Sequence, residues 1–102
     1  FFTSGATRNR RPFWGPYSAS KAALETLVAT YAKATEKTAL NTLVINPGPM
    51  RTAMRAEAMP GENPETLAHP DEFAALLPSL CTAQMQESGV MWDYQTRAFL
   101  AI

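Results

Sequence analysis

The hydrophobic positions of this chain form short strand-like runs around one long helical repeat. Residues 1–3, Phe1-Phe2-Thr3, have the character of a short buried strand, which the small residues after them end. In residues 18–35 apolar side chains recur every three or four residues, the spacing of one buried helix face, and this face comprises Leu24, Leu27, Val28, Tyr31 and Ala32. Residues 40–46 form a second strand, whose unbroken Leu43-Val44-Ile45 run is typical of a parallel sheet covered on both faces.

Proline and glycine mark the connections between these elements. Residues 7–16 are predicted to be a loop from their turn chemistry, and Pro47-Gly48-Pro49 ends the second strand abruptly. Residues 51–70 indicate short helical pieces in a long irregular excursion. An excursion of this length in a compact domain is more often functional than idle.

The last third of the chain contains a second helix and a third strand. Residues 71–82 follow a helical pattern that places Cys81 on an apolar face as a core residue, and Pro78 must kink or split the helix. His69 has no partner at metal-ligand spacing and is predicted to be a helix-entry residue, so we expect no metal site. Residues 89–92 are a short strand. The order strand, helix, strand, helix, strand predicts right-handed parallel crossovers and therefore an α/β fold.

Composition narrows the class of protein. Apolar residues make up 46% of the chain, and nine basic residues balance nine acidic ones, which excludes a nucleic-acid binder driven by bulk charge. No apolar run approaches the roughly 18 residues that span a bilayer, so we expect no membrane association. The single cysteine excludes an internal disulfide and fits the reducing cytoplasm. The chain begins without Met inside a predicted strand, and we expect it to be part of a longer protein.

Polar residues cluster where the predicted strands end, which is where open α/β sheets bind ligands. Ser4 ends the first strand, Tyr17 and Lys21 open the long helix, and Thr52 follows the second strand. Because Tyr17 and Lys21 are four residues apart, a helix places them on one face, where the ammonium favours the phenolate. The pair alone fits a half-buried tyrosine beside a solvated lysine equally well. The combination with Ser4 and the Pro47-Gly48 turn favours a catalytic site.

These motifs resemble the short-chain dehydrogenase/reductase family. The resemblance rests on Tyr17-Ser18-Ala19-Ser20-Lys21, preceded by Phe1-Phe2-Thr3-Ser4 and followed by Val44-Ile45-Asn46-Pro47-Gly48-Pro49-Met50-Arg51-Thr52. It covers nearly the whole chain and implies a partial Rossmann-like fold, with residues 1–102 as the C-terminal catalytic portion of one such domain. It also implies an NAD- or NADP-dependent oxidoreductase that interconverts a small-molecule carbonyl and an alcohol by hydride transfer.

The resemblance assigns roles to individual residues. Tyr17 would be the general acid/base toward the substrate oxygen, Ser4 would hydrogen-bond that same oxygen, and Lys21 would favour ionised Tyr17 and bind the nicotinamide ribose. The turn that contacts the nicotinamide carboxamide and the pyrophosphate would comprise Pro47, Gly48, Met50 and Thr52. Tyr17 and Lys21 would also contact the cofactor. Candidate walls of the substrate pocket are Gly5, Ala6, Phe13 and Trp14.

The resemblance also implies a partner, because the helix at residues 18–35 corresponds to one that packs across a subunit interface. We therefore expect a homo-oligomer, a dimer or a tetramer. Three arginines precede the helix and have two interpretations, a phosphate contact or a solvated loop, of which the zero net charge favours the second; they are Arg8, Arg10 and Arg11. Arg51 and Arg55 flank the cofactor turn and are either exposed or aimed at an anionic group.

The chain departs from the family pattern in its glycines. None of its five glycines are spaced as the glycine-rich cofactor fingerprint, which lies at the start of the family's domain. The choice between NAD and NADP therefore stays open, and we expect these 102 residues alone not to turn over substrate. A non-catalytic Rossmann-like binding or regulatory module that kept the motif is the alternative. A purely structural interaction domain would require every match to be accidental.

Overall fold

The computed structural model describes residues 1–102, which divide into two compact units. The first unit combines Phe1–Gly48 with Gln86–Ile102, and the second is Pro49–Met85. The second unit thus combines the predicted irregular excursion at residues 51–70 with the predicted helix at residues 71–82.

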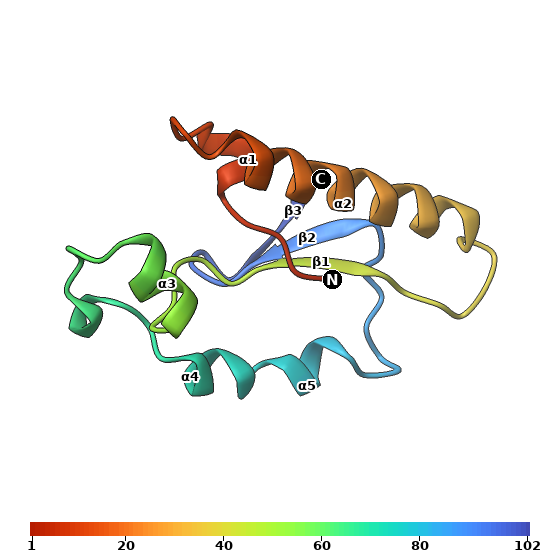
Figure 1. The fold of residues 1–102 in the computed structure, drawn as a ribbon. Coiled ribbons are helices and arrows are strands. Elements are labelled where there is room, and N and C mark those ends of the chain that lie inside the picture. The colour runs from red at the N-terminus through yellow and green to blue at the C-terminus, as the bar shows by residue number, and fades with distance from the viewer. The chain divides into compact units, whose positions relative to one another are not determined.

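The first unit contains a three-stranded mixed sheet in the order β1-β2-β3 (Figure 1). Strand β1 (Leu43–Asn46) pairs in parallel with β2 (Val90–Asp93), as the sequence predicted. Strand β3 (Ala98–Ala101) pairs antiparallel with β2, so the expectation of parallel strands alone was wrong at this edge. The partial Rossmann-like α/β class is confirmed, with a hairpin added to it.

The amino-terminal segment extends the sheet on the other side of β1. Phe2 forms a parallel bridge with Ile45, and hydrogen bonds join the Ile45 amide to the Phe1 carbonyl at 2.7 Å and the Thr3 amide to the Ile45 carbonyl at 2.9 Å. Only Thr3 is buried, whereas Phe1 and Phe2 are exposed. The predicted parallel pairing of this segment was therefore right, but its predicted burial was wrong for Phe1 and Phe2, because no further strand of this chain pairs with its outer edge.

Helix α2 (Gly15–Ala34) lies along one face of this sheet and makes the core of the unit (Figure 1). Pro16 occupies its first turn, where the missing amide donor costs no hydrogen bond. Val28 packs with Val44 and Met91, and all three are almost fully buried. The long helical repeat and the continuous strand run thus meet as predicted.

The buried stripe of α2 differs from the predicted one. Val28 and Ala32 are buried, but Leu27 is 65% and Tyr31 46% exposed, while Glu25 is only 8% exposed. Successive helical residues rotate by about 100°, so Leu27 lies more than a quarter turn from Val28. The sheet therefore buries a stripe of α2 that is narrower than the apolar face of the helix, and Glu25 lies at the margin of the buried stripe.

A short helix, α1 (Ala6–Asn9), overlaps the start of the predicted loop at residues 7–16, and α2 begins at Gly15, before the predicted end of that loop. Left-handed backbone at Arg10 and Phe13 separates the two helices. These non-glycine residues are not the usual carriers of positive φ, so turn chemistry alone did not mark the helix ends.

The second unit consists of four short helical pieces, in agreement with the predicted excursion and split helix. They are α3 (Ala53–Ala58), the 3-10 helix η1 (Pro64–Thr66), α4 (Pro70–Ala74) and α5 (Leu77–Leu80). Pro78 lies in the first turn of α5, which explains the break after α4. His69 caps α4 by accepting from the Asp71 amide, as expected of a helix-entry residue. Cys81 is exposed, so its prediction as a core residue was wrong; α5 ends before it.

None of the helices has both the length and the apolar character that crossing a membrane requires.

Candidate functional site

Two of the predicted site segments leave the sheet at the same end, where the parallel strands have their carboxyl ends. Ser4 directly follows the segment paired with β1, and Pro47-Gly48 directly follows β1. Because the two segments run parallel, both sets of residues emerge at the carboxyl ends of their strands, where α/β sheets bind ligands. The Tyr94 amide, just beyond β2, donates to the Asn46 carbonyl at 2.9 Å, so the last residue of β1 is also hydrogen-bonded at this end of the sheet.

Tyr17 and Lys21 lie on one face of the first turns of α2, as their spacing predicted. The Lys21 ammonium is 6.0 Å from the Tyr17 ring centroid, within cation–π range. Lys21 Nζ also donates to the Phe2 carbonyl at 3.2 Å, which ties the helix to the segment that carries Ser4. The Trp14 ring meets the Tyr17 ring edge-on, with centroids 5.6 Å apart at 87°. The phenol is therefore held between an indole and an ammonium.

The Ser4 hydroxyl is fixed as an acceptor and keeps its proton for another partner. Its Oγ accepts from the Ala6 amide at 3.2 Å, and its carbonyl accepts from Thr7 Oγ1 at 3.1 Å. A serine hydroxyl has one O–H donor in addition to its lone pairs, and this bond uses only a lone pair. Ser4 can therefore donate a hydrogen bond to a substrate oxygen.

Glu25 is a residue of this region that the sequence analysis missed. It is buried, and its Oε1 accepts from Thr3 Oγ1 at 2.6 Å and from Thr7 Oγ1 at 3.0 Å. Arg8 Nη1 lies 3.7 Å from the same oxygen. No local pattern marked it, because a charged residue in a helix normally indicates a solvated surface.

The Pro47-Gly48 turn is held by a second polar network that the sequence did not reveal. The Gly48 amide donates to Asn46 Oδ1 at 3.1 Å, and Asn46 Nδ2 donates to Asp93 Oδ1 at 3.0 Å. The other oxygen of the buried Asp93 accepts from the amide and the hydroxyl of Thr96, at 3.0 and 2.8 Å. The β2–β3 hairpin thus supports the turn after β1.

Gly48 has a backbone conformation that side chains disfavour, with φ of +72°, and a Cβ there would lie 2.9 Å from Gln95 Cδ. We expect Gly48→Ala to lower the free energy of unfolding by about 1–3 kcal/mol, from left-handed strain plus displacement of the Gln95 side chain. Urea denaturation of the full-length protein measures this. Gly61→Ala is the matched control, because nothing lies near its added carbon. Equal stability of the two variants would contradict the strain argument.

Met50 and Thr52 belong to the second unit. Met50 is buried and bridges Ala68, and the Thr52 hydroxyl caps α3 by accepting from the Arg55 amide at 3.1 Å. Arg55 forms a bidentate ion pair with Glu62, with both contacts at 2.8 Å, and this hydrogen bonding raises the pKa of the guanidinium above its ordinary value. The cofactor roles of Met50 and Thr52 stay predictions.

Arg51 also has a partner within the second unit. Its Nε donates to the Pro64 carbonyl at 3.1 Å. Both arginines beside the predicted turn are thus engaged within their own unit.

The four predicted pocket residues have unequal surroundings. Trp14 contacts Tyr17 directly, and Gly5 is half-buried beside Ser4. Ala6 is buried, and Phe13 is fully exposed on its left-handed backbone. Trp14 is therefore the pocket residue with the clearest contact to the candidate site, and the roles of the other three stay predictions.

The arginines of the loop are exposed, as the second interpretation expected. Arg8 reaches Glu25 and the Ala101 carbonyl, and the Arg11 guanidinium lies 5.1 Å from the Trp14 ring centroid. These contacts account for the two side chains without a phosphate.

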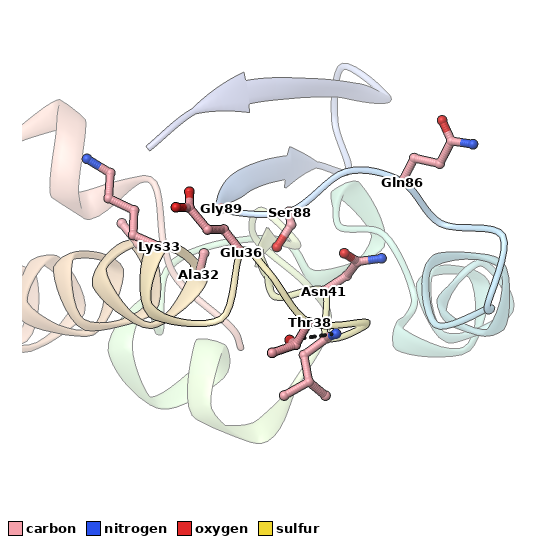
Figure 2. A pocket seen from close by; sticks show the side chains of 10 residues that line it. Ala32, Lys33, Glu36, Thr38, Asn41, Gln86, Ser88 and Gly89 are labelled. Atoms are coloured by element: carbon pink, nitrogen blue, oxygen red, sulfur yellow. Dashed lines mark hydrogen bonds between the residues drawn. The ribbon is translucent and has the colours of Figure 1, made fainter.

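A separate pocket of about 380 Å³ lies at the other end of the first unit's sheet (Figure 2). Lys33 and Glu36, at and just beyond the end of α2, flank it together with Asn41 before β1 and Ser88 before β2. It opens at the amino ends of the parallel strands, whereas Ser4 and Gly48 lie at their carboxyl ends. This pocket therefore shares no residue with the candidate site.

Known proteins match this chain in sequence and in structure. The short chain dehydrogenase family profile matches residues 1–63, more than half of the chain. An uncharacterized oxidoreductase, YciK of Escherichia coli (strain K12), is 41% identical over 76 residues, which are 74% of this chain and 30% of that protein. An NADPH-dependent aldehyde reductase-like protein, chloroplastic, of Arabidopsis thaliana is 38% identical over 70% of this chain and 26% of its own length.

Solved structures agree. A protein of Escherichia coli CFT073 named as a short chain dehydrogenase and complexed with NADPH superposes with a TM-score of 0.85. It is 36% identical, and the match covers 93% of this chain and 40% of that one. The chain belongs to the short-chain dehydrogenase/reductase family. It spans less than half the length of these relatives, and its predicted place in the C-terminal part of their domain stays a prediction.

Proposed function

We propose that this chain carries the catalytic group of an NAD(P)-dependent oxidoreductase that interconverts a carbonyl and an alcohol. The observation that supports it most is the arrangement at the start of α2, where Lys21 lies over the Tyr17 ring and is bonded to the segment that ends in Ser4. Family membership supports the reaction class. The relatives are named as oxidoreductases, one of them as NADPH-dependent.

Each of the three residues has one task in this proposal. The Tyr17 hydroxyl gives its proton to the carbonyl oxygen during reduction and removes it from the alcohol during oxidation. Ser4 donates a hydrogen bond to the same oxygen and holds it in place. The Lys21 ammonium favours the phenolate that remains after Tyr17 has given up its proton.

The residues of the first unit fit a nicotinamide cofactor, NAD or NADP. Lys21 has three donors, and one is used by the Phe2 carbonyl, so two remain for ribose hydroxyls. Pro47 and Gly48 would face the nicotinamide end, and Met50 and Thr52 are the further candidates. The cofactor would supply the hydride, and the chain supplies position and the proton.

Turnover by the full-length protein tests the proposed function. We expect NADPH or NADH to be oxidised in the presence of at least one member of a panel of aldehydes and ketones, with no oxidation when the carbonyl is omitted. Loss of near-ultraviolet absorbance of the reduced cofactor reports the reaction. Cofactor binding without turnover across the panel would contradict it and would favour the non-catalytic module.

The surface of α2 supports a homo-oligomer of the full-length protein. Leu27 and Tyr31 are exposed side chains on a helix whose buried stripe, around Val28, makes the core. We expect a dimer or a tetramer, and Leu27→Asp to shift it toward monomer because a carboxylate would be desolvated at the interface. Sedimentation equilibrium measures this, with Thr26→Asp on the same helix as control. A monomeric wild-type protein would remove the inference.

A further inference from the structure

A single carboxylate joins the helix of the candidate site to the segment that carries Ser4. Glu25 Oε1 accepts from Thr3 Oγ1 at 2.6 Å and from Thr7 Oγ1 at 3.0 Å. Thr3 precedes Ser4 directly, and Thr7 follows it by three residues. Both hydroxyls therefore bond the same oxygen from the two sides of Ser4.

The other ends of this connection are fixed. The Thr3 amide donates to the Ile45 carbonyl of β1, and the Thr7 amide donates to the Ser4 carbonyl. The single Thr7 hydroxyl proton is shared between the Ser4 carbonyl, 3.1 Å from Oγ1, and Glu25 Oε1. Glu25 lies about two turns after Tyr17 on helix α2. The Glu25 carboxylate thus ties the Ser4 segment to the helix that carries Tyr17, in addition to the bond from Lys21 Nζ to the Phe2 carbonyl.

The chemistry of the position favours a functional reason for a hydrogen-bond acceptor at residue 25. Glu25 is 8% exposed at the edge of the core stripe of α2, where an apolar side chain would bury without losing hydration. Arg8 at 3.7 Å partly compensates the carboxylate, although its own side chain is half exposed. A carboxylate can accept from two donors at once, which an apolar residue cannot do.

We propose that Glu25 is a positioning residue that holds the Ser4 hydroxyl in register with Tyr17. The inference rests on the proposed function, because it acts on the hydrogen bond that Ser4 donates to the substrate oxygen. Loss of the carboxylate lets the Ser4 segment shift. Misplacement by about 1 Å can lower a rate by on the order of 100-fold.

Kinetics of variants of the full-length protein test this. We expect Glu25→Ala to lower kcat by about 10- to 100-fold and to leave the KM for the reduced cofactor within about 2-fold. Glu25→Gln keeps an acceptor oxygen for both hydroxyls and should restore kcat to within about 5-fold of wild type. Glu36→Ala, at an exposed glutamate just beyond the same helix, is the matched control and should match wild type.

A double-mutant cycle separates positioning from general destabilisation. In a Ser4→Ala background Glu25→Ala should lower kcat by less than about 3-fold, because the hydroxyl that it positions is gone. An undiminished effect in that background would overturn the proposal, as would a Glu25→Ala protein with wild-type kcat. Should Glu25→Ala fail to fold, Thr3→Val removes the 2.6 Å hydroxyl bond to Glu25 and no bond to Ser4, and its loss of kcat must likewise vanish with Ser4→Ala.

The failure of this inference is distinguishable from that of the proposed function. A wild-type protein without turnover on the carbonyl panel overturns both. An active wild-type protein whose kcat is insensitive to substitution of Glu25 and Thr3 overturns the positioning role alone.

Discussion

Tyr17→Phe in the full-length protein is expected to lower kcat for carbonyl reduction by about 10²- to 10⁴-fold, the usual range for a positioned acid/base. Phenylalanine keeps the ring that meets Trp14 edge-on and lies under the Lys21 ammonium, and it lacks only the hydroxyl. The carbonyl oxygen would then have no proton donor at this position. Steady-state kinetics with a saturating carbonyl substrate measure the change.

Binding and a matched variant control this result. The cofactor affinity of Tyr17→Phe, measured by fluorescence titration, should change far less than kcat, because Lys21 and the Pro47-Gly48 turn are intact. Tyr31→Phe removes the hydroxyl of an exposed tyrosine on the same helix and should match wild type. Wild-type kcat in Tyr17→Phe would refute the acid/base role.

Met91→Ala is expected to lower the free energy of unfolding by about 2–5 kcal/mol, because it removes a buried side chain and leaves a cavity. Met91 is 1% exposed on the central strand β2 and packs with Val28 of α2 and Val44 of β1. The residue therefore joins the helix to two strands. Urea denaturation followed by tryptophan fluorescence reports the loss, since the neighbouring Trp92 is itself buried.

An exposed methionine provides the comparison. Met54 is 65% exposed, and Met54→Ala should change stability by no more than about 0.5 kcal/mol. The same loss in both variants would mean that Met91 does not support the core in the way that its packing indicates.

The elements of the first unit could largely be predicted from the sequence, because their hydrophobic residues form either a continuous run or a regular helical repeat. Leu43-Val44-Ile45 gave β1, and the repeat around Val28 gave α2. Strand β3 was missed because its residues show no clear alternation. The turn between β2 and β3 also contains Arg97 with left-handed backbone, a conformation that glycine usually marks in a sequence.

The residues of the candidate site that could be predicted were those whose spacing in the sequence itself indicates that they lie together. The four-residue interval of Tyr17 and Lys21 placed them on one face, and Ser4 was expected at a strand end. Glu25 and Asp93 were not found, because a charged residue normally indicates a solvated surface. Their burial depends on hydroxyl and amide partners that lie far away in the sequence, which local patterns do not show.

Isotope transfer tests the central claim most directly. The full-length protein is incubated with a carbonyl substrate and NADPH or NADH in which both hydrogens at the reactive carbon of the nicotinamide are deuterium, and the alcohol is analysed by mass spectrometry. Deuterium bonded to the carbinol carbon, formed by wild type and nearly lost in Tyr17→Phe, is the result that we predict. An alcohol without deuterium, or equal transfer by the two proteins, would contradict hydride transfer assisted by Tyr17.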